Sequence, residues 1–496
     1  MKTWITHGFD KIIVDLPASD ELKKEFALYL TKGGEGGCQI VANSDADGKI
    51  QLKVKRCDGV SVKLYSEHIT HEINGHKHTD CIIPYEGELL DIKGGISLPF
   101  YLDFKAENAG DYTASFELVD GNGAVVETFT VAIHVWSFAL PENKTFQTAG
   151  HTTDYYIQRF DPELKGEAYK VYYDLLLEHG VSSYNLPYNI LDTRADEYMS
   201  DPRVTSFVVG IGEIEKMSDE EILKYYNKLK TNPVWMKKAI IYPLDEPSSP
   251  EQVKEYLAFA ERFARLCPGM SRVSPFYTNV QMGEEKDQVD EMAPVTNHWC
   301  PKLCLWDDAR SYERFLNYTP EKSFWTRMDE FKARGDRMWT YVCNAPISPY
   351  AQFFIDTPGV MQRAMFWQIY ERDIDGFLYW STNYWGYYAG DVDPWENVCN
   401  GVYGEDAPVY GEGFLLYPGT GIGKPGPIPT IRLKIFRDSV NDIEMFNLAG
   451  EYLGRDWVKE RINKATPSLT EFASNDVLAS VRKEIGDALE KAISNK

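Results

Sequence analysis

Hydrophobic and polar positions alternate repeatedly over the first third of the chain. A turn at Asp120-Gly121-Asn122-Gly123 separates the last two alternating segments, which predicts a β-hairpin. Short strands at this regular spacing predict an N-terminal β-sandwich over residues 1–140. The alternating segments are Gln39–Asn43, Ile50–Arg56, Val60–Ser66, Ser97–Lys105, Tyr112–Val119 and Val125–Trp136.

After a linker around Pro141, short apolar runs alternate with helical patterns. Eight alternations over about 235 residues predict an α/β fold with a (β/α)8 TIM barrel in residues 141–429. An open doubly wound sheet is the alternative, but no glycine-rich phosphate-binding turn follows the early strands. The eight runs are Thr148–Thr152, Ser183–Leu186, Ser206–Ile211, Ala239–Leu244, Val273–Tyr277, Val295–Trp299, Met338–Val342 and Gly376–Trp380.

The segments between these runs have helical periodicity and helix-capping residues. We expect helices at Glu163–His179, after Ser218, and at Pro250–Leu266, Tyr312–Ala333 and Gly359–Glu371. Residues 381–429 are rich in Gly, Pro, Trp and Tyr, which predicts a long loop over the C-terminal mouth of the barrel. Helical patterns at Thr430–Leu453 and Leu478–Ile493 predict a C-terminal helical extension, residues 430–496, outside the barrel.

Bulk properties restrict the classes of partner. The 496 residues carry a formal net charge of −23 and no basic tract, which argues against nucleic-acid binding. No apolar run is long enough for membrane insertion. The first fifteen residues contain no signal peptide, so we expect a cytoplasmic protein, or a secreted or periplasmic one if a leader has been removed.

Histidines and cysteines give little support for a metal site. The eight cysteines form no CxxC pair, and the spacing of Cys300 and Cys304 has no matching second pair. An exposed hairpin around Asn74-Gly75 explains the histidine-rich stretch better than metal binding does. We therefore expect no metal. The histidines in question are His68, His71, His76 and His78.

Two adjacent carboxylates, Asp245 and Glu246, directly follow the fourth run, in Ala239-Ile-Ile-Tyr-Pro-Leu-Asp-Glu-Pro247. Catalytic groups of barrel enzymes lie at the C-terminal ends of strands. Helix capping is the alternative role for such a tripeptide, but the position after a barrel strand favours catalysis. Two carboxylates this close do not readily both ionise, so we expect one raised pKa, as a general acid needs.

The seventh run ends at Asn344 without a carboxylate. An ordinary retaining glycosidase needs a nucleophilic carboxylate about 5 Å from its acid, usually on another strand. Its absence points to substrate-assisted hydrolysis, in which the 2-acetamido oxygen of the sugar attacks the anomeric carbon. Glu246 would then be the acid and base, and Asp245 would accept the amide N–H and stabilise the oxazolinium-like intermediate. This mechanism predicts retention of configuration.

Other strand ends and the loop after the eighth run supply candidate substrate contacts. Amide and imidazole groups can hold sugar hydroxyls, and aromatic rings can stack on a pyranose. Aromatic residues make up 14% of the chain, which adds weight to a sugar pocket. The candidates are Tyr184, Asn185, His298, Trp299, Tyr341, Asn344, Trp380, Tyr384 and Trp385.

The sequence resembles glycoside hydrolase family 123, the β-N-acetylgalactosaminidases, over most of its length. The resemblance rests on Leu98-Pro-Phe-Tyr-Leu-Asp103, Tyr242-Pro-Leu-Asp-Glu-Pro247, Asp375-Gly-Phe-Leu-Tyr-Trp380, Gly411-Glu-Gly-Phe-Leu-Leu-Tyr-Pro-Gly419, Ile431-Arg-Leu and Phe436-Arg-Asp438. It implies a β-sandwich, a (β/α)8 barrel, retaining substrate-assisted hydrolysis and no metal or cofactor. The implied substrate is a glycan or glycoconjugate with terminal β-linked N-acetylgalactosamine, as on glycosphingolipids.

Two other interpretations fit the same residues. One is a related barrel hydrolase that acts on another sugar, with or without a 2-acetamido group. The other is a non-catalytic carbohydrate-binding protein, which would keep the aromatic residues but would not need both carboxylates. An interaction module has no supporting feature beyond the acidic charge.

Overall fold

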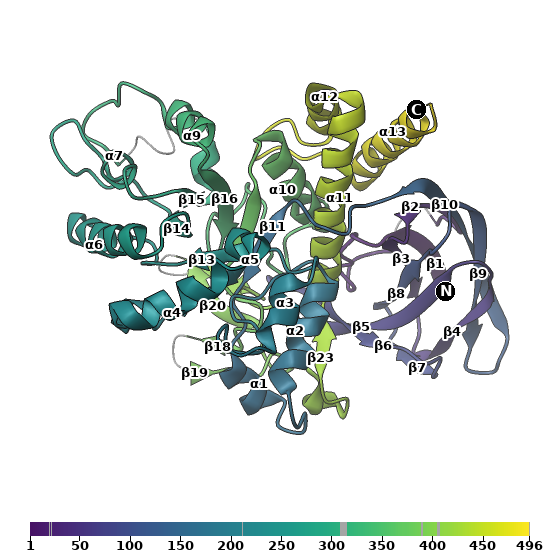
Figure 1. Cartoon of the computed structure of the whole chain (residues 1–496). Coiled ribbons are helices and arrows are strands. Elements are labelled where there is room, and N and C mark those ends of the chain that lie inside the picture. The colour runs from purple at the N-terminus through teal and green to yellow at the C-terminus, as the bar shows by residue number, and fades with distance from the viewer. Residues whose placement is uncertain are drawn as a thin grey trace.

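The N-terminal part consists of two facing sheets in a computed structural model, which describes residues 1–18, 20, 22–210, 212–307, 315–387, 390–403 and 407–495. Apolar side chains such as Ile40, Phe100 and Phe116 fill the space between the sheets. The predicted sandwich-like arrangement is therefore confirmed (Figure 1). One sheet has the order β1 (Lys2–His7), β3 (Glu35–Asn43), β8 (Ser97–Lys105), β5 (Ser61–Ile73), β6 (His76–Pro84), and the other β2 (Glu25–Lys32), β10 (Val125–Ala139), β9 (Gly110–Asp120), β4 (Gly48–Cys57), β7 (Leu90–Ile92).

Both predicted hairpins are present. In the turn between β9 and β10, the carboxylate of Asp120 accepts hydrogen bonds from the backbone N–H groups of Asn122 and Ala124, both at 2.9 Å. The histidine-rich stretch forms the β5–β6 hairpin, whose turn places Asn74 at φ +53° and Gly75 at φ +83°. Among the described residues, no cluster of His, Cys, Asp and Glu side chains could hold a metal ion.

The middle of the chain forms a nearly closed, parallel, barrel-like sheet of seven strands in the described residues, rather than eight. The sheet has the order β11, β17, β16, β15, β14, β13, β12. The strands are β11 (Gln147–Gly150), β12 (Phe207–Val208), β13 (Ala239–Ile241), β14 (Ser271–Phe276), β15 (His298–Pro301), β16 (Arg337–Val342) and β17 (Gly376–Tyr379).

The missing strand is the second predicted run, Ser183–Leu186. It makes one parallel bridge, from Ser183 to Gly150, and the Tyr184 carbonyl accepts the N–H of Val208 at 2.9 Å. These bonds link β11 to β12 across the gap. Pro187 has no N–H to extend a ladder beyond this point, and no regular strand develops.

Helices connect most of the strands, as predicted. Ser218 caps its helix with a capping box, and the predicted bounds Pro250–Leu266 and Gly359–Glu371 agree with α6 and α10. The predicted helix Tyr312–Ala333 begins only at Phe324, capped by Ser323; its residues 312–314 lie outside the described residues. The helices are α1 (Asp154–Phe160), α2 (Ala168–Glu178), α3 (Ala195–Ser200), α4 (Asp219–Leu229), α5 (Pro233–Lys238), α6 (Pro250–Leu266), α7 (Gln288–Met292), α9 (Phe324–Ala333) and α10 (Gly359–Glu371), with the 3-10 turns η1 (Ile214–Lys216) and η2 (Leu303–Trp306).

The segment after β17 is irregular, with three small hairpins and one 3-10 turn in its described part. It returns to the end of β17, where the Tyr379 hydroxyl accepts the N–H of Gly413 at 3.0 Å. This places it over the C-terminal ends of the strands, as expected. Its elements are β18 (Gly386–Tyr387), β19 (Gly390–Asp391), β20 (Cys399–Tyr403), β21 (Ala407–Tyr410), β22 (Leu416–Pro418), η3 (Gly419–Ile422) and β23 (Pro427–Pro429).

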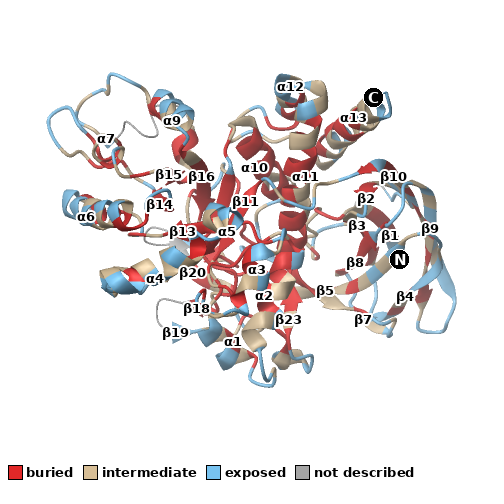
Figure 2. Ribbon diagram, in the orientation of Figure 1, coloured by how far each residue is buried: buried red, intermediate tan, exposed pale blue. Residues whose placement is uncertain are grey.

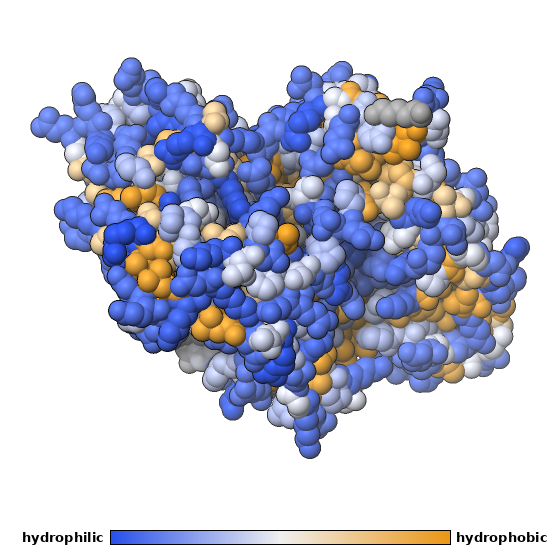
Figure 3. All heavy atoms as spheres, viewed as in Figure 1, coloured by the Kyte–Doolittle hydropathy of each residue, from blue (hydrophilic) through white to orange (hydrophobic). Residues whose placement is uncertain are grey.

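Three helices end the chain: α11 (Ile431–Leu453), α12 (Arg455–Ala465) and α13 (Asn475–Ser494). They lie outside the barrel, as predicted, and α11 runs between the barrel and the N-terminal sheets (Figure 1). Most of α11 is buried, unlike a surface helix with one apolar stripe (Figure 2). The face of the molecule in Figure 3 is mostly hydrophilic, with small, separate groups of hydrophobic residues.

Buried ion pairs join α11 to the N-terminal sheets. Arg432 donates two hydrogen bonds to Asp80 of β6, at 2.6 and 2.7 Å, and both side chains are fully buried. Asp103 of β8 accepts from Lys434 and Arg437 at 2.8 to 3.0 Å. Burial alone would raise the pKa of Asp103, but the two cations outweigh it and hold this pKa below its ordinary value.

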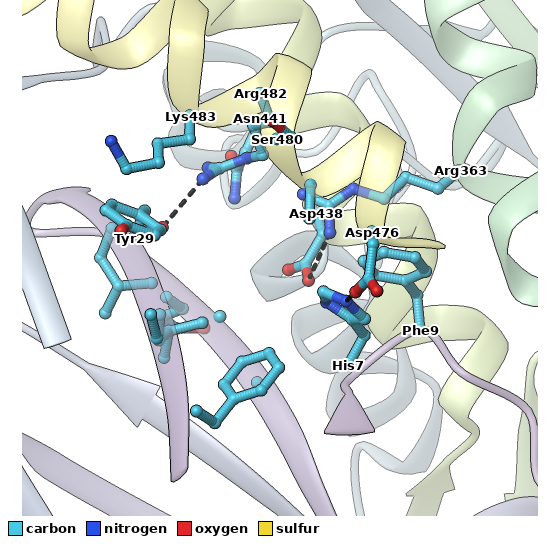
Figure 4. A pocket seen from close by; sticks show the side chains of 18 residues that line it. His7, Phe9, Tyr29, Arg363, Asp438, Asn441, Asp476, Ser480, Arg482 and Lys483 are labelled. Atoms are coloured by element: carbon cyan, nitrogen blue, oxygen red, sulfur yellow. Dashed lines mark hydrogen bonds and ion pairs between the residues drawn. The ribbon is translucent and has the colours of Figure 1, made fainter. Parts of the chain in front are cut away.

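A small cavity of about 240 Å³ lies at the same interface, between β2 and α13 (Figure 4). Polar side chains from both sides pair across it. His7 contacts Asp476 at 2.8 Å, and Arg482 donates to the carbonyl of Tyr29 at 2.8 Å. These pairs join the N-terminal sheets to α13 across the cavity.

Replacing Asp80 with Ala should strongly destabilise the protein. The guanidinium of Arg432 would remain buried without its counter-charge, and such a loss costs about 3–5 kcal/mol. Denaturant unfolding measures the change. The control is Asp91→Ala, which breaks an exposed pair with Lys49 and should change stability little. Equal effects of the two substitutions would show that the buried pair has no special weight.

Candidate active site

Asp245 and Glu246 lie just beyond the C-terminal end of β13, as predicted. The strand Ala239–Ile241 is buried, and Pro243 and Pro247 prevent its continuation. Glu246 has φ +43°, a left-handed conformation that costs a non-glycine residue about 1–3 kcal/mol. Strain of this kind concentrates at functional sites, because the surrounding structure must be built to hold it.

Each carboxylate has its own tyrosine. The Tyr242 hydroxyl donates to Oδ1 of Asp245 at 2.6 Å, and the Tyr341 hydroxyl donates to Oε1 of Glu246. Desolvation by the cavity walls raises the pKa of Asp245, and the charge of Glu246 adds to the effect. The Tyr242 hydrogen bond and Lys302 act in the opposite direction and reduce this rise.

Lys302 is a site residue that the sequence analysis missed. Its side chain is 7% exposed, and its ammonium nitrogen lies 3.5 Å from Oε1 of Glu246. The nitrogen also lies over two tyrosine rings, 4.7 Å from the centroid of Tyr277 and 5.3 Å from that of Tyr341. The sequence feature that could have indicated Lys302 is a single lysine within an otherwise apolar stretch after a predicted strand.

The two carboxylates open into a cavity of about 820 Å³, which is within the usual range for small-molecule sites. Three predicted contacts line it: Tyr184, Tyr341 and Trp380. His151 and Tyr242 also line it and were not predicted. The rings of His151 and Tyr184 stack at 5.5 Å, which gives the cavity an aromatic wall.

His298 and Trp299 are core residues, and the prediction that they contact the substrate is wrong. Both are fully buried; His298 bonds Ser271 at 2.7 Å, and the Trp299 indole donates to Asp336 at 2.8 Å. The predicted strand was placed at Val295–Trp299, whereas β15 covers His298–Pro301. The C-terminal end of the strand therefore presents Lys302 in their place.

The remaining candidates do not line the cavity either. Trp385 is buried in the core, where its indole donates to the Leu416 carbonyl at 2.9 Å. Asn344 accepts a bond from the Cys343 thiol, and the Asn185 carbonyl accepts one from Tyr169. Tyr384 packs its ring against Trp380 at 4.9 Å, so it supports the wall from behind.

Glu412 is a buried acid beside the site, and the sequence analysis did not select it. The Trp380 indole donates to its carboxylate, and Glu412 is 4% exposed. Burial raises the pKa of Glu412 to about 8, although Trp380, Lys302 and Arg432 favour its charged form. Glu412 comes from the loop after β21, far along the chain from the other acids, so sequence spacing gives no indication of it.

The comparisons with known proteins identify the family of this chain. The family described as glycoside hydrolase 123, catalytic domain, matches residues 183–449, which include both carboxylates. The chain belongs to glycoside hydrolase family 123. It is therefore a glycoside hydrolase, and the non-catalytic alternative is excluded.

Solved structures support the fold of this family 123 enzyme. A family 123 glycoside hydrolase from Clostridium perfringens, described for glycolipid glycan hydrolysis, is 13% identical with a TM-score of 0.66, over 99% of this chain and 98% of the other. A GH2 β-galacturonidase from Eisenbergiella tayi is 12% identical over 89% of this chain and 73% of the other, with a TM-score of 0.31, too low to establish a shared fold. Curated protein sequences contain no match. In the described part of the chain, no helix is long and apolar enough to cross a membrane.

Replacing Tyr242 with Phe should raise the pKa of Asp245 further, because the lost hydroxyl stabilises the ionised carboxylate. A raised carboxylate pKa delays ionisation to higher pH. We expect the acid limb of kcat/KM, measured on any glycoside that this family 123 enzyme hydrolyses, to move to higher pH by about one unit. Tyr173→Phe, in α2 outside the cavity lining, is the control. An unmoved acid limb would assign that limb to another group.

Proposed function

We propose that this enzyme is a retaining exo-glycoside hydrolase that releases terminal β-linked N-acetylgalactosamine by a substrate-assisted, oxazoline-forming mechanism. The observation that carries the proposal is the pair of adjacent carboxylates at the end of β13, each held by a separate tyrosine at one cavity. β16 is followed by Cys343 and Asn344 instead of a nucleophilic carboxylate. Neighbouring acids with different partners suit two different tasks.

In the first step, the acetamido carbonyl oxygen of the substrate forms a bond to the anomeric carbon. The bond from that carbon to the leaving oxygen breaks, and Glu246 gives its proton to that oxygen. Asp245 accepts the amide N–H and faces the positive charge of the oxazolinium ion. In the second step, Glu246 takes a proton from water, which attacks the anomeric carbon and restores the acetamido group. Two inversions give net retention.

The raised pKa of Asp245 fits this task. An ionised carboxylate in a desolvating cavity is unfavourable, and the cation that forms during the reaction relieves the cost. The attraction is therefore stronger in the transition state than in the free enzyme, which is the condition for catalysis. Ground-state binding gains less from it.

The cavity also bears on the sugar. Trp380 and Tyr184 offer aromatic surfaces for a pyranose, and the volume suits a terminal residue rather than a long chain. Glycolipid glycans are natural candidates as substrates, because the structurally similar Clostridium perfringens protein is described for their hydrolysis. A related 2-acetamido sugar is the nearest alternative, and the substrate panel below distinguishes the two.

Other acids near the cavity have features that disfavour a nucleophilic role. Glu215 and Glu255 line the cavity from η1 and α6 rather than from a strand end. Glu412 lies behind Trp380 and already accepts its indole N–H. An ordinary retaining mechanism would need one of the three about 5 Å from Glu246, across the sugar ring.

Glu246→Gln should abolish turnover of aryl β-N-acetylgalactosaminide, and Asp245→Asn should lower kcat by about 10²-fold or more. Asp245→Asn should unfold at the wild-type temperature, because Asp245 is exposed. Glu246→Gln should unfold at a lower temperature, because the buried Lys302 loses its counter-charge, so activities are compared at a temperature where both variants are folded. Glu255→Gln is the matched control, since it neutralises an exposed acid of the same cavity. A thiazoline that imitates the oxazoline should inhibit the wild type.

The substrate panel contains the galacto and gluco 2-acetamido glycosides and the corresponding glycosides without the acetamido group. Hydrolysis of the last class would contradict substrate assistance. Loss of activity in Glu215→Gln or Glu412→Gln equal to that in Glu246→Gln would favour a protein nucleophile. Faster hydrolysis of the gluco epimer would keep the mechanism and change the sugar.

A further inference from the structure

Lys302 lies where it can act on the reaction without contacting the sugar. It follows β15 directly, and its N–H donates to the Phe276 carbonyl at 2.9 Å, which fixes the backbone beside β14. The side chain is buried, and its ammonium lies between the rings of Tyr277 and Tyr341. A buried ammonium is costly unless an opposite charge is near, and Glu246 supplies that charge.

Both stabilising contacts of Glu246 fall on the same oxygen. Oε1 accepts the Tyr341 hydroxyl and lies 3.5 Å from the Lys302 nitrogen. Oε2 has no hydrogen-bond partner among the residues that the structure describes. Because an oxygen that accepts a hydrogen bond and lies beside an ammonium is a poor place for a proton, the two oxygens of this carboxyl group are not equivalent.

We propose that Lys302 is a positioning residue for the hydrolysis: its ammonium and the Tyr341 hydroxyl hold Oε1 of Glu246, so that the transferable proton is carried on Oε2. The inference rests on the proposed function, in which Glu246 is the acid and base. When Glu246 has given up its proton, the ammonium stabilises the carboxylate that must then activate water.

Several other titratable groups face this pair, and they must be considered in any pH profile. Burial lowers the pKa of Lys302, but Cys343 and Glu246 outweigh it, so the pKa of Lys302 is raised and the ammonium stays charged at neutral pH. The charge of Lys302 also favours the ionised forms of Asp245 and Glu412. The groups around the pair are Asp245, Tyr277, Cys300, Cys304, Tyr341, Cys343 and Glu412.

The test is the pH dependence of kcat/KM in Lys302→Met. The basic limb, which reports deprotonation of the acid, should move to higher pH by about one unit or more, because the cation that favours the carboxylate is gone. We expect kcat at the new optimum to fall about tenfold and KM to change little, since Lys302 does not touch the sugar. Lys302→Arg keeps the charge and should keep the basic limb near its wild-type pH.

The control for removal of a buried lysine is Lys11→Met. Lys11 donates to the carbonyls of Phe354 and Thr357, outside the site, and its loss should lower the unfolding temperature without moving the limb. A basic limb that stays at the wild-type pH in a folded Lys302→Met variant would overturn the proposal. A limb shift of equal size in Lys11→Met would overturn it as well.

A reciprocal measurement needs no change at Lys302. NMR titration of lysine labelled with ¹³C at Cε should show one lysine whose pKa falls when Glu246 is replaced by Gln, because coupling between two groups acts equally in both directions. Absence of such a lysine overturns the inference even if Lys302→Met does not fold. Retained activity in Glu246→Gln would overturn the proposed function instead, and the Lys302–Glu246 coupling would still be measured.

Discussion

Arg432 is the point at which three parts of the molecule are held together. Its guanidinium pairs with Asp80 of the N-terminal sheets and donates to the carbonyls of Phe353 and Gly411, at 2.8 and 2.6 Å. All of these groups are buried, so none of the bonds competes with water. A buried ion pair is weak evidence for stability by itself, but this one fixes the relative position of the elements that it joins.

The position of one wall of the active site depends on this contact. Gly411 precedes Glu412, whose carboxylate accepts the indole N–H of Trp380. Gly413 follows and donates to the hydroxyl of Tyr379, which fixes the same loop to the end of β17. The orientation of Trp380 at the cavity therefore depends on α11 and, through Arg432, on β6. The N-terminal sheets therefore help to hold one wall of the active site of this glycoside hydrolase.

The sequence was sufficient for those parts of the fold and site that depend on local pattern. The bounds of α6 follow from Ser249, Pro250 and a clear apolar period, and Asp245 and Glu246 follow an unambiguous buried strand. It was insufficient where register or tertiary contact decides. β15 ends two residues later than predicted, at Pro301 instead of Trp299, so His298 and Trp299 lie in the core and Lys302 follows the strand end.

Other failures have the same origin. Trp385 lies in an aromatic-rich loop, but it is buried in the core. Its ring packs against Phe160 and its indole N–H donates to the Leu416 carbonyl. Glu412 reaches the site only because the loop after β21 folds back toward the cavity, and no local sequence pattern predicts that path. The second predicted strand, Ser183–Leu186, makes only one bridge, to Gly150, because Pro187 cannot extend a ladder.

Asp245 and Glu246 are neighbours in the sequence, but the groups around their carboxylates differ. Two neighbouring carboxylates in one medium would compete for a single proton and share it. Here Asp245 has a neutral partner, Tyr242, while Glu246 has both the Tyr341 hydroxyl and the Lys302 ammonium. The partners come from different strands, so the barrel itself separates the two acids chemically. The difference between the environments of Asp245 and Glu246 is thus a property of the strand ends around them rather than of the Asp-Glu pair.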